Sequence, residues 1–91
     1  MLAEYCKANS IRLLIASLPE LHDVNHYRFQ RITDLLRNAA KQYGAEFVDI
    51  LPYVANQRSS NLWVTPSDVH ANALAHDLIA RGLFAAFDRH P

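Results

Sequence analysis

The chain has little of several residue types, and each shortage excludes a class of protein. Its 91 residues include one cysteine, Cys6, so an internal disulfide and a cysteine-rich zinc site are both excluded. We expect Cys6 to be a small buried apolar residue, as free cysteines commonly are. Lysine and arginine number 9, as do aspartate and glutamate, so the chain has no basic excess to attract a nucleic acid.

Long apolar runs are also missing. No stretch of about twenty apolar residues is present, so the sequence predicts no membrane span. The opening MLAEYCKANS lacks the basic start and apolar centre of a signal peptide, and the composition fits the cytoplasm for the chain as given. Because 51% of the residues are hydrophobic and 20% are charged, we expect residues 1–91 to form one globular domain.

The apolar pattern predicts an α/β fold with parallel strands. Ile11–Ser17 is a short and nearly continuous apolar run, which is typical of a strand covered on both faces. His26–Tyr43 has apolar residues at helical spacing and ends at Gly44, which suits a left-handed cap. Ala45–Ile50 is a second apolar run, so strand, helix and strand form a right-handed βαβ unit.

Further helices are predicted towards both ends of the chain. Leu2–Ala8 is expected to be the end of a helix that is already under way, with Asn9 as its cap. Leu51–Trp63 is predicted to be a long connection with one helical turn around Tyr53–Asn56.

The last helix is predicted over Ala73–Asp88, after Asn72 as its N-cap. Gly82 lies inside this helix, where glycine is less favourable than alanine by about 1 kcal/mol. We therefore expect Gly82 to mark close packing against a neighbouring element.

The sheet predicted in this way is incomplete. A strand that is apolar on both faces needs a neighbour on each edge, whereas Ile11–Ser17 has one certain partner, Ala45–Ile50. Two strands rarely form an independently stable sheet. We expect either a missing N-terminal portion or a second copy of the chain to complete it.

Asp68 and His70 are the candidate catalytic residues of the sequence. They lie two positions apart and directly precede the last helix. Ligands of open parallel sheets bind beyond the carboxyl ends of the strands, where this segment is expected to lie. An aspartate can accept from one imidazole nitrogen and leave the other free to take a proton from a hydroxyl nucleophile. The D-x-H spacing also arises by chance, and Asp68 could simply serve the helix start.

The segment that carries the pair, SDVHANALAHDLIA, resembles the last conserved block of the SGNH, or GDSL-type, hydrolases. That block holds the family's catalytic Asp and His, and the matching residues here are Asp68, His70, Asn72 and His76. The stretch RLLIASLPELHD, then a helix and AEFVDILP, also resembles the penultimate and last strands of the family's flavodoxin-like three-layer α/β/α fold. The resemblance implies that the chain, from about Ile11 onward, is the C-terminal part of such a hydrolase.

The resemblance implies hydrolysis of esters or of acyl groups on sugars or lipids, with Asp68 as orienter, His70 as base and no cofactor. His22, Asn72 and His76 are candidates for the surrounding pocket, although His76 is also expected to be a packed or capping histidine. The family's GDS block and oxyanion-hole residues are absent, and Ala71 replaces the usual proline. The serines of this chain all lack the setting of a nucleophile: Ser10, Ser17, Ser59, Ser60 and Ser67.

Two other interpretations remain open. The chain could be a non-catalytic structural or interaction module, or a truncated product, which the incomplete sheet supports. Its large aromatic residues would then be either interface anchors or ordinary core and loop residues: Tyr27, Phe29, Tyr53 and Trp63. A zinc site is the other interpretation, but H-x-x-x-H in a loop fixes no geometry. Its ligands would be drawn from two segments: His22, Asp23, His26, Asp68 and His70.

Overall fold

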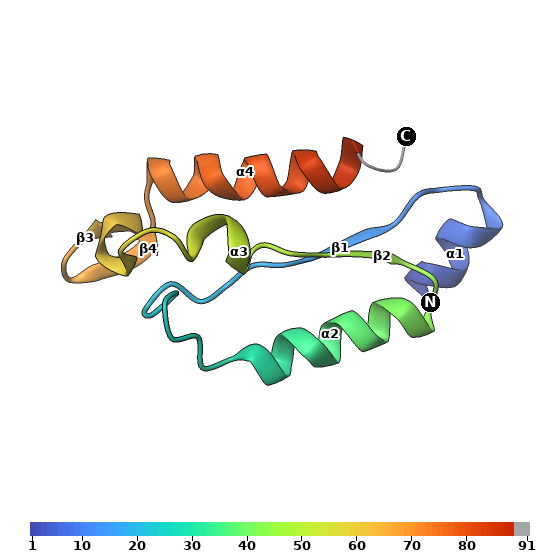
Figure 1. Ribbon diagram of the computed structural model, residues 1–91. Coiled ribbons are helices and arrows are strands. Elements are labelled where there is room, and N and C mark those ends of the chain that lie inside the picture. The colour runs from blue at the N-terminus through green and yellow to red at the C-terminus, as the bar shows by residue number, and fades with distance from the viewer. Residues whose placement is uncertain (89–91) are drawn as a thin grey trace.

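Helices lie on both sides of a two-stranded parallel sheet in the computed structural model, which describes residues 1–88 (Figure 1). A short antiparallel pair of strands precedes the last helix, so the fold is mixed α/β, as predicted. The elements follow in this order: α1 (Leu2–Ala8), β1 (Leu14–Ser17), α2 (Gln30–Gln42), β2 (Glu46–Asp49), α3 (Leu51–Val54), the 3-10 turn η1 (Ser59–Leu62), β3 (Trp63–Thr65), β4 (Asp68–Ala71) and α4 (Ala73–Asp88).

The predicted βαβ unit is confirmed. Strands β1 and β2 are parallel, with Leu14–Ser17 aligned against Glu46–Asp49. Gly44 has a φ of +73°, which ends α2 and turns the chain into β2, as the sequence predicted. The prediction that β1 is covered on both faces is wrong for the chain by itself, since only Ser17 of this strand is buried. One edge of β1 has no neighbouring strand among residues 1–88, so its side chains remain partly open to water.

Helix α2 begins at Gln30 and not at His26 as predicted. The side chain of Asp23 accepts hydrogen bonds from the backbone N–H groups of Asn25, at 3.2 Å, and of His26, at 3.0 Å. An aspartate that bonds the backbone two and three residues later holds a turn and competes with helix formation. Residues 18–29 therefore form a loop at the carboxyl end of β1.

The apolar stripe of α2 is covered on one side only. Thr33 and Ala40 are buried, with 2% and 0% exposed. Ile32 and Leu36 belong to the same predicted stripe, yet 54% and 40% of their surfaces are exposed. The helix thus faces the sheet with one margin of its apolar surface and presents the other to solvent.

Helix α4 packs against the other side of the sheet, and Gly82 makes the approach possible. A Cβ atom at Gly82 would lie 2.8 Å from Cδ1 of Ile50 and 2.9 Å from Cδ2 of Tyr53. The expectation that this glycine marks close packing is confirmed. Val48, Ile50 and Ala86 form the buried core between β2 and α4.

A second apolar core lies at the carboxyl end of the two parallel strands. Its buried residues come from the loop, α3, η1 and α4: Leu21, Val24, Val54, Leu62 and Ala75. The predicted helical turn in the connection is present as α3, slightly earlier than Tyr53–Asn56. The β3–β4 hairpin was not predicted, because these strands are very short and Pro66 separates them.

The predicted bounds of the first helix, its cap and the burial of Cys6 are confirmed. Helix α1 spans the predicted residues, and Cys6 is buried with 6% exposed. Asn9 is its C-cap, and the Asn9 side chain donates to the Tyr5 carbonyl at 2.8 Å. Ser10, the next residue, adopts a left-handed φ of 56°. Within residues 1–88, none of the helices has both the length and the apolarity needed to cross a membrane.

Candidate functional site

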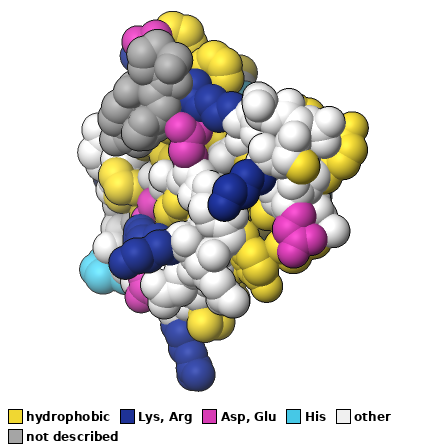
Figure 2. All heavy atoms as spheres, turned by 90° about the vertical axis from the view of Figure 1, so that its right-hand side faces the viewer, with side chains coloured by type: hydrophobic (Ala, Val, Ile, Leu, Met, Phe, Trp, Pro, Cys, Tyr) yellow, Lys and Arg dark blue, Asp and Glu magenta, His cyan; other side chains and the backbone are white. Residues whose placement is uncertain are grey.

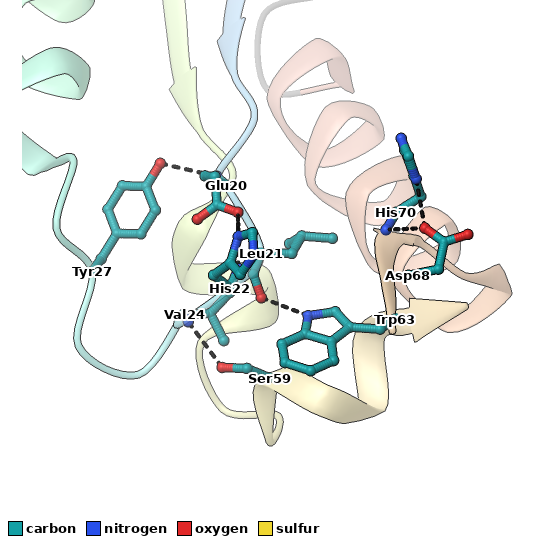
Figure 3. A network of polar contacts seen from close by, with 9 residues as sticks. All are labelled: Glu20, Leu21, His22, Val24, Tyr27, Ser59, Trp63, Asp68 and His70. Carbon is teal, nitrogen blue, oxygen red and sulfur yellow. Dashed lines mark hydrogen bonds and ion pairs between the residues drawn. The ribbon is translucent and has the colours of Figure 1, made fainter. Parts of the chain in front are cut away.

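The carboxyl end of the β1–β2 sheet gathers the loop of residues 18–29, α3, η1 and the β3–β4 hairpin (Figure 1). Several hydrogen bonds tie the loop to the later segment, and Figure 3 shows two of them. The indole N–H of Trp63 donates to the Leu21 carbonyl at 2.8 Å, and the backbone N–H of Val24 donates to Oγ of Ser59 at 3.0 Å. These contacts fix the surroundings of the predicted site by joining positions far apart in the sequence.

Asp68 and His70 form the predicted pair. Both lie on β4, where residues two apart point to the same face of a strand. Nδ1 of His70 lies 2.6 Å from Oδ1 of Asp68, and the same oxygen accepts the backbone N–H of His70 at 3.1 Å. The carboxylate therefore holds both the ring and the backbone of the histidine.

The pair is open to water. The side chain of His70 is 90% exposed and that of Asp68 is 45% exposed. The hydrogen bond from the His70 ring lowers the pKa of Asp68 most, and the backbone hydrogen bond from His70 lowers it further, with a slight opposing effect of burial. Nε2 of His70 makes no hydrogen bond within residues 1–88, so this nitrogen is accessible to a reacting group.

An NMR pH titration is expected to give Asp68 a pKa below the ordinary value of 3.8. Because the folded-state pKa is lowered, the ionised carboxylate favours the folded state above about pH 4, and this contribution is lost as the pH falls through the folded-state pKa. His70→Ala should raise the Asp68 pKa part of the way back, since the backbone hydrogen bond remains. His76→Ala is the control and should not change it. An unchanged Asp68 pKa in His70→Ala would contradict the pairing.

Asn72 has a structural role. Its Oδ1 accepts the backbone N–H of Ala75 at 2.9 Å, which confirms it as the N-cap of α4. Its Nδ2 donates to the carbonyl groups of Asn61, at 2.7 Å, and of Trp63, at 3.0 Å. Asn72 thus joins η1, β3 and the start of α4, and all its polar atoms are occupied in doing so.

His22 lies beside an open cavity of about 690 Å³ in the loop of residues 18–29. The residues that line this cavity are Glu20, His22, Asp23, Tyr27, Arg28 and Phe29. Nδ1 of His22 pairs with Oε1 of Glu20, and its ring meets that of Trp63 edge-on at 6.3 Å between centroids. Glu20 was missed from the sequence, although the Glu-x-His spacing repeats that of the Asp68–His70 pair.

The cavity and the Asp68–His70 pair are separate. Neither residue of the pair lines the cavity, and Figure 3 shows Trp63 between the two groups of side chains. His76 is exposed on α4 and does not line the cavity, so the expectation of a packed or capping histidine is wrong. The reason is its position on the helix, away from the buried side marked by Ala75 and Gly82.

Within residues 1–88, neither a metal site nor a serine nucleophile accompanies the Asp68–His70 pair. In the part of the chain that the structure describes, no three His, Cys, Asp or Glu residues gather closely enough to hold a metal ion. Ser67 is the serine nearest in sequence to His70, but its hydroxyl lies 3.4 Å from that of Thr65. No hydroxyl group within residues 1–88 is hydrogen-bonded to His70.

The aromatic residues considered as anchors have different surroundings. Trp63 is half-buried and hydrogen-bonded. The hydroxyl of Tyr27, also half-buried, accepts the backbone N–H of Glu20 at 3.0 Å. Phe29 and Tyr53 are 39% and 36% exposed. The first two therefore serve local packing, while the other two leave apolar surface open.

Comparison of the chain with protein-family models, with curated proteins and with solved structures found no match. The function of the site therefore rests on its own geometry. A carboxylate holds Nδ1 of an imidazole, and Nε2 is open to solvent, at the carboxyl end of two parallel strands. An imidazole held in this way can take a proton from a hydroxyl group or a water molecule.

Proposed function

We propose that this chain supplies the base and the orienting carboxylate of an SGNH-like serine hydrolase. The observation that carries the proposal is the 2.6 Å contact between Nδ1 of His70 and Oδ1 of Asp68. The sequence resemblance of residues 67–80 to the last block of these hydrolases supports the same roles. The substrate class is then an ester, or an acyl group on a sugar or a lipid.

Asp68 and His70 have different roles in general-base catalysis. Asp68 keeps the proton of His70 on Nδ1 and stabilises the imidazolium that forms during the reaction. Nε2 of His70 takes the proton of an attacking hydroxyl and returns it to the leaving group. The nucleophile and the donors for the oxyanion come from polypeptide outside residues 1–91, since no serine of this chain has the required setting.

The same proposal implies a three-layer fold. Helices α2 and α4 lie on opposite sides of the β1–β2 sheet (Figure 1). Further parallel strands beside β1 would extend this arrangement into a three-layer, flavodoxin-like α/β/α sandwich. The uncovered margin of α2 supports this, because it would lie over the added strands.

A non-catalytic interaction module is the second candidate function. The observation that favours it is the exposure of large apolar residues on α2 and the loop before it, such as Phe29, Ile32 and Leu36. Such a surface is typical of a contact with another protein. This candidate needs no chemistry from Asp68 and His70, so the two functions are separated by tests of activity.

The first test measures hydrolysis of a simple aryl ester, p-nitrophenyl acetate, by the chain of residues 1–91. We expect a rate no greater than that of free imidazole at the same concentration, because the chain lacks a positioned nucleophile and an oxyanion hole. Faster hydrolysis that is lost in His70→Ala would show a nucleophile within residues 1–91, with Ser67 the first to replace. Faster hydrolysis that chelator removes and His70→Ala leaves unchanged would reject the hydrolase proposal in favour of a metal site.

A further inference from the structure

The chain exposes more surface than a compact protein of its size. Its accessible surface is 6438 Å², whereas a compact monomer of 10.3 kDa exposes about 5,400 Å². Its radius of gyration is 14.6 Å, against about 12 Å for a compact chain of this length. Figure 2 shows apolar side chains in several surface patches between charged ones. The surplus of about 1,000 Å² is close to what one partner buries in a standard protein–protein interface, about 800 Å².

The backbone of β1 presents an open edge. The carbonyl groups of Leu13 and Ser17 accept the N–H groups of Glu46, at 3.0 Å, and Ile50, at 3.1 Å. In a parallel pair, successive residues direct their backbone groups to opposite edges of the strand. The N–H and C=O groups of Leu14 and Ala16 therefore point away from β2, where the sheet has no further strand within residues 1–88.

The uncovered margin of α2 lies beside this edge. We call it the α2 flank and define it as Phe29, Ile32 and Leu36, which are 39%, 54% and 40% exposed. These three residues line an open groove of about 310 Å³ together with Ala16 and Leu18 at the end of β1. An unpaired strand edge and an apolar helix surface thus meet at one place.

The three residues of the α2 flank are uncharged, and Glu20 is the one charged residue that lines the same groove. On the opposite margin of the helix, Arg37 lies over the Phe47 ring at 5.2 Å and 3.7 Å from the carboxylate of Asp49, which places that margin over β2. The formal charge of the chain is zero, so two copies can approach without net repulsion. The surface is therefore suited to an apolar partner.

We propose that a second copy of this chain covers the β1 edge and the α2 flank. The two β1 strands pair antiparallel about a two-fold axis, with Leu14 of each copy opposite Ala16 of the other. This joins the two sheets into one, in the order β2–β1–β1–β2. The same axis places the two α2 helices on one side of the joined sheet, so that each α2 flank covers the other, as an isologous interface requires.

A second copy satisfies both parts of the surface at once. The outward N–H and C=O groups of Leu14 and Ala16 form ladder hydrogen bonds, which removes the hazard of an open strand edge. The apolar flank is buried against an identical apolar flank, and the surplus surface of the whole chain is of the size that one partner buries in a standard interface. An extended peptide could pair with β1 but would leave Ile32 and Leu36 exposed.

This dimer of residues 1–91 does not rest on the chemistry proposed for Asp68 and His70. Antiparallel pairing places the two Asp68–His70 pairs at opposite ends of the joined sheet, so neither copy supplies a nucleophile to the other. A nucleophile-bearing polypeptide that extends the sheet at β1 would occupy the same edge and displace the second copy. Failure of the esterase experiments therefore does not affect the dimer, and the reverse also holds.

Sedimentation equilibrium of the full chain over micromolar to millimolar concentrations tests the proposal. We expect a monomer–dimer equilibrium with a dimer of twice the 10.3 kDa chain mass. Ile32→Glu should raise the dimer dissociation constant by about 100-fold or more, because its carboxylate would be buried without a partner. Ala16→Pro should have a similar effect by removing an outward N–H, and proline is tolerated where the N–H of an edge strand faces solvent.

Phe84→Glu is the matched control. Phe84 is 69% exposed and lies two residues after the buried Gly82, which is about 200° around the helix from it. The same charge there should leave the dissociation constant unchanged. Circular dichroism should show that all three variants stay folded, and an unfolded variant is replaced by Leu36→Glu.

Amide hydrogen exchange supplies a second measurement. The N–H groups of Leu14 and Ala16 should exchange slowly in the dimer and faster in the Ile32→Glu monomer. A chain that stays monomeric, that forms oligomers larger than two, or that dimerises equally well in Ile32→Glu and Ala16→Pro would each overturn the proposal. Loss of the dimer in Phe84→Glu would overturn it as well, since the interface would then lie on α4.

Discussion

Replacing Asp68 by asparagine is expected to lower kcat by about 10⁴-fold in a longer chain that supplies the nucleophile block ahead of residue 1. Asparagine has nearly the size and shape of aspartate, so the local structure should persist, although the backbone N–H of His70, 3.1 Å from Oδ1, loses this acceptor when the amide N–H faces the ring. What changes is which nitrogen of the His70 ring carries the proton. An amide N–H facing Nδ1 favours the tautomer with its proton on Nε2, and that nitrogen can no longer act as the base.

His70→Ala should remove nearly all activity of the same longer chain, because it deletes the base itself. His76→Ala is the matched control and should change kcat far less, since His76 is exposed and away from the pair. Steady-state kinetics on an aryl ester measure all three variants, with circular dichroism to verify folding. A decrease of less than about tenfold in both Asp68→Asn and His70→Ala would show that the pair only stabilises the hairpin.

Ile50→Ala is expected to lower the free energy of unfolding by about 2–5 kcal/mol. Ile50 is 0% exposed and packs with Val48 and Ala86 where α4 crosses β2 at Gly82. A domain of this size has a total stability of only about 5–14 kcal/mol, so the loss is a large part of it. Urea denaturation followed by circular dichroism gives the measurement.

Ile11→Ala makes the same chemical change at a residue that is 49% exposed before β1. We expect it to alter the free energy of unfolding by no more than about 0.5 kcal/mol. The difference between the two variants isolates the contribution of packing between β2 and α4. Equal losses from both would mean that Ile50 is not held in a tight core.

The parts of the fold that were predicted depend on local sequence. Helical spacing identified α2 and α4, and the two short apolar runs gave β1 and β2. The start of α2 was placed too early, because the Asp23 side chain holds a turn that spacing does not reveal. Which apolar residues are buried was also not predictable, since the pattern marks surfaces suited to burial and does not show whether a partner covers them.

The same distinction between local sequence and long-range contacts applies to the candidate site. Asp68 and His70 were predicted from the D-x-H spacing and from the resemblance to the hydrolase block, and they meet because residues two apart on a strand point to the same face. The cavity beside His22 depends on how the loop of residues 18–29 closes, and its Glu20–His22 pair was overlooked. The zinc interpretation required two distant segments to converge, and within residues 1–88 they do not.

Trp63 is the one tryptophan of the chain, and its indole N–H is bonded to the Leu21 carbonyl between the loop and the hairpin. Its intrinsic fluorescence therefore reports on a single junction of the molecule. Opening of the loop would expose the indole to water and shift its emission to longer wavelength while the helical signal remains. Local opening at this end of the sheet can thus be followed separately from global unfolding, without an added label.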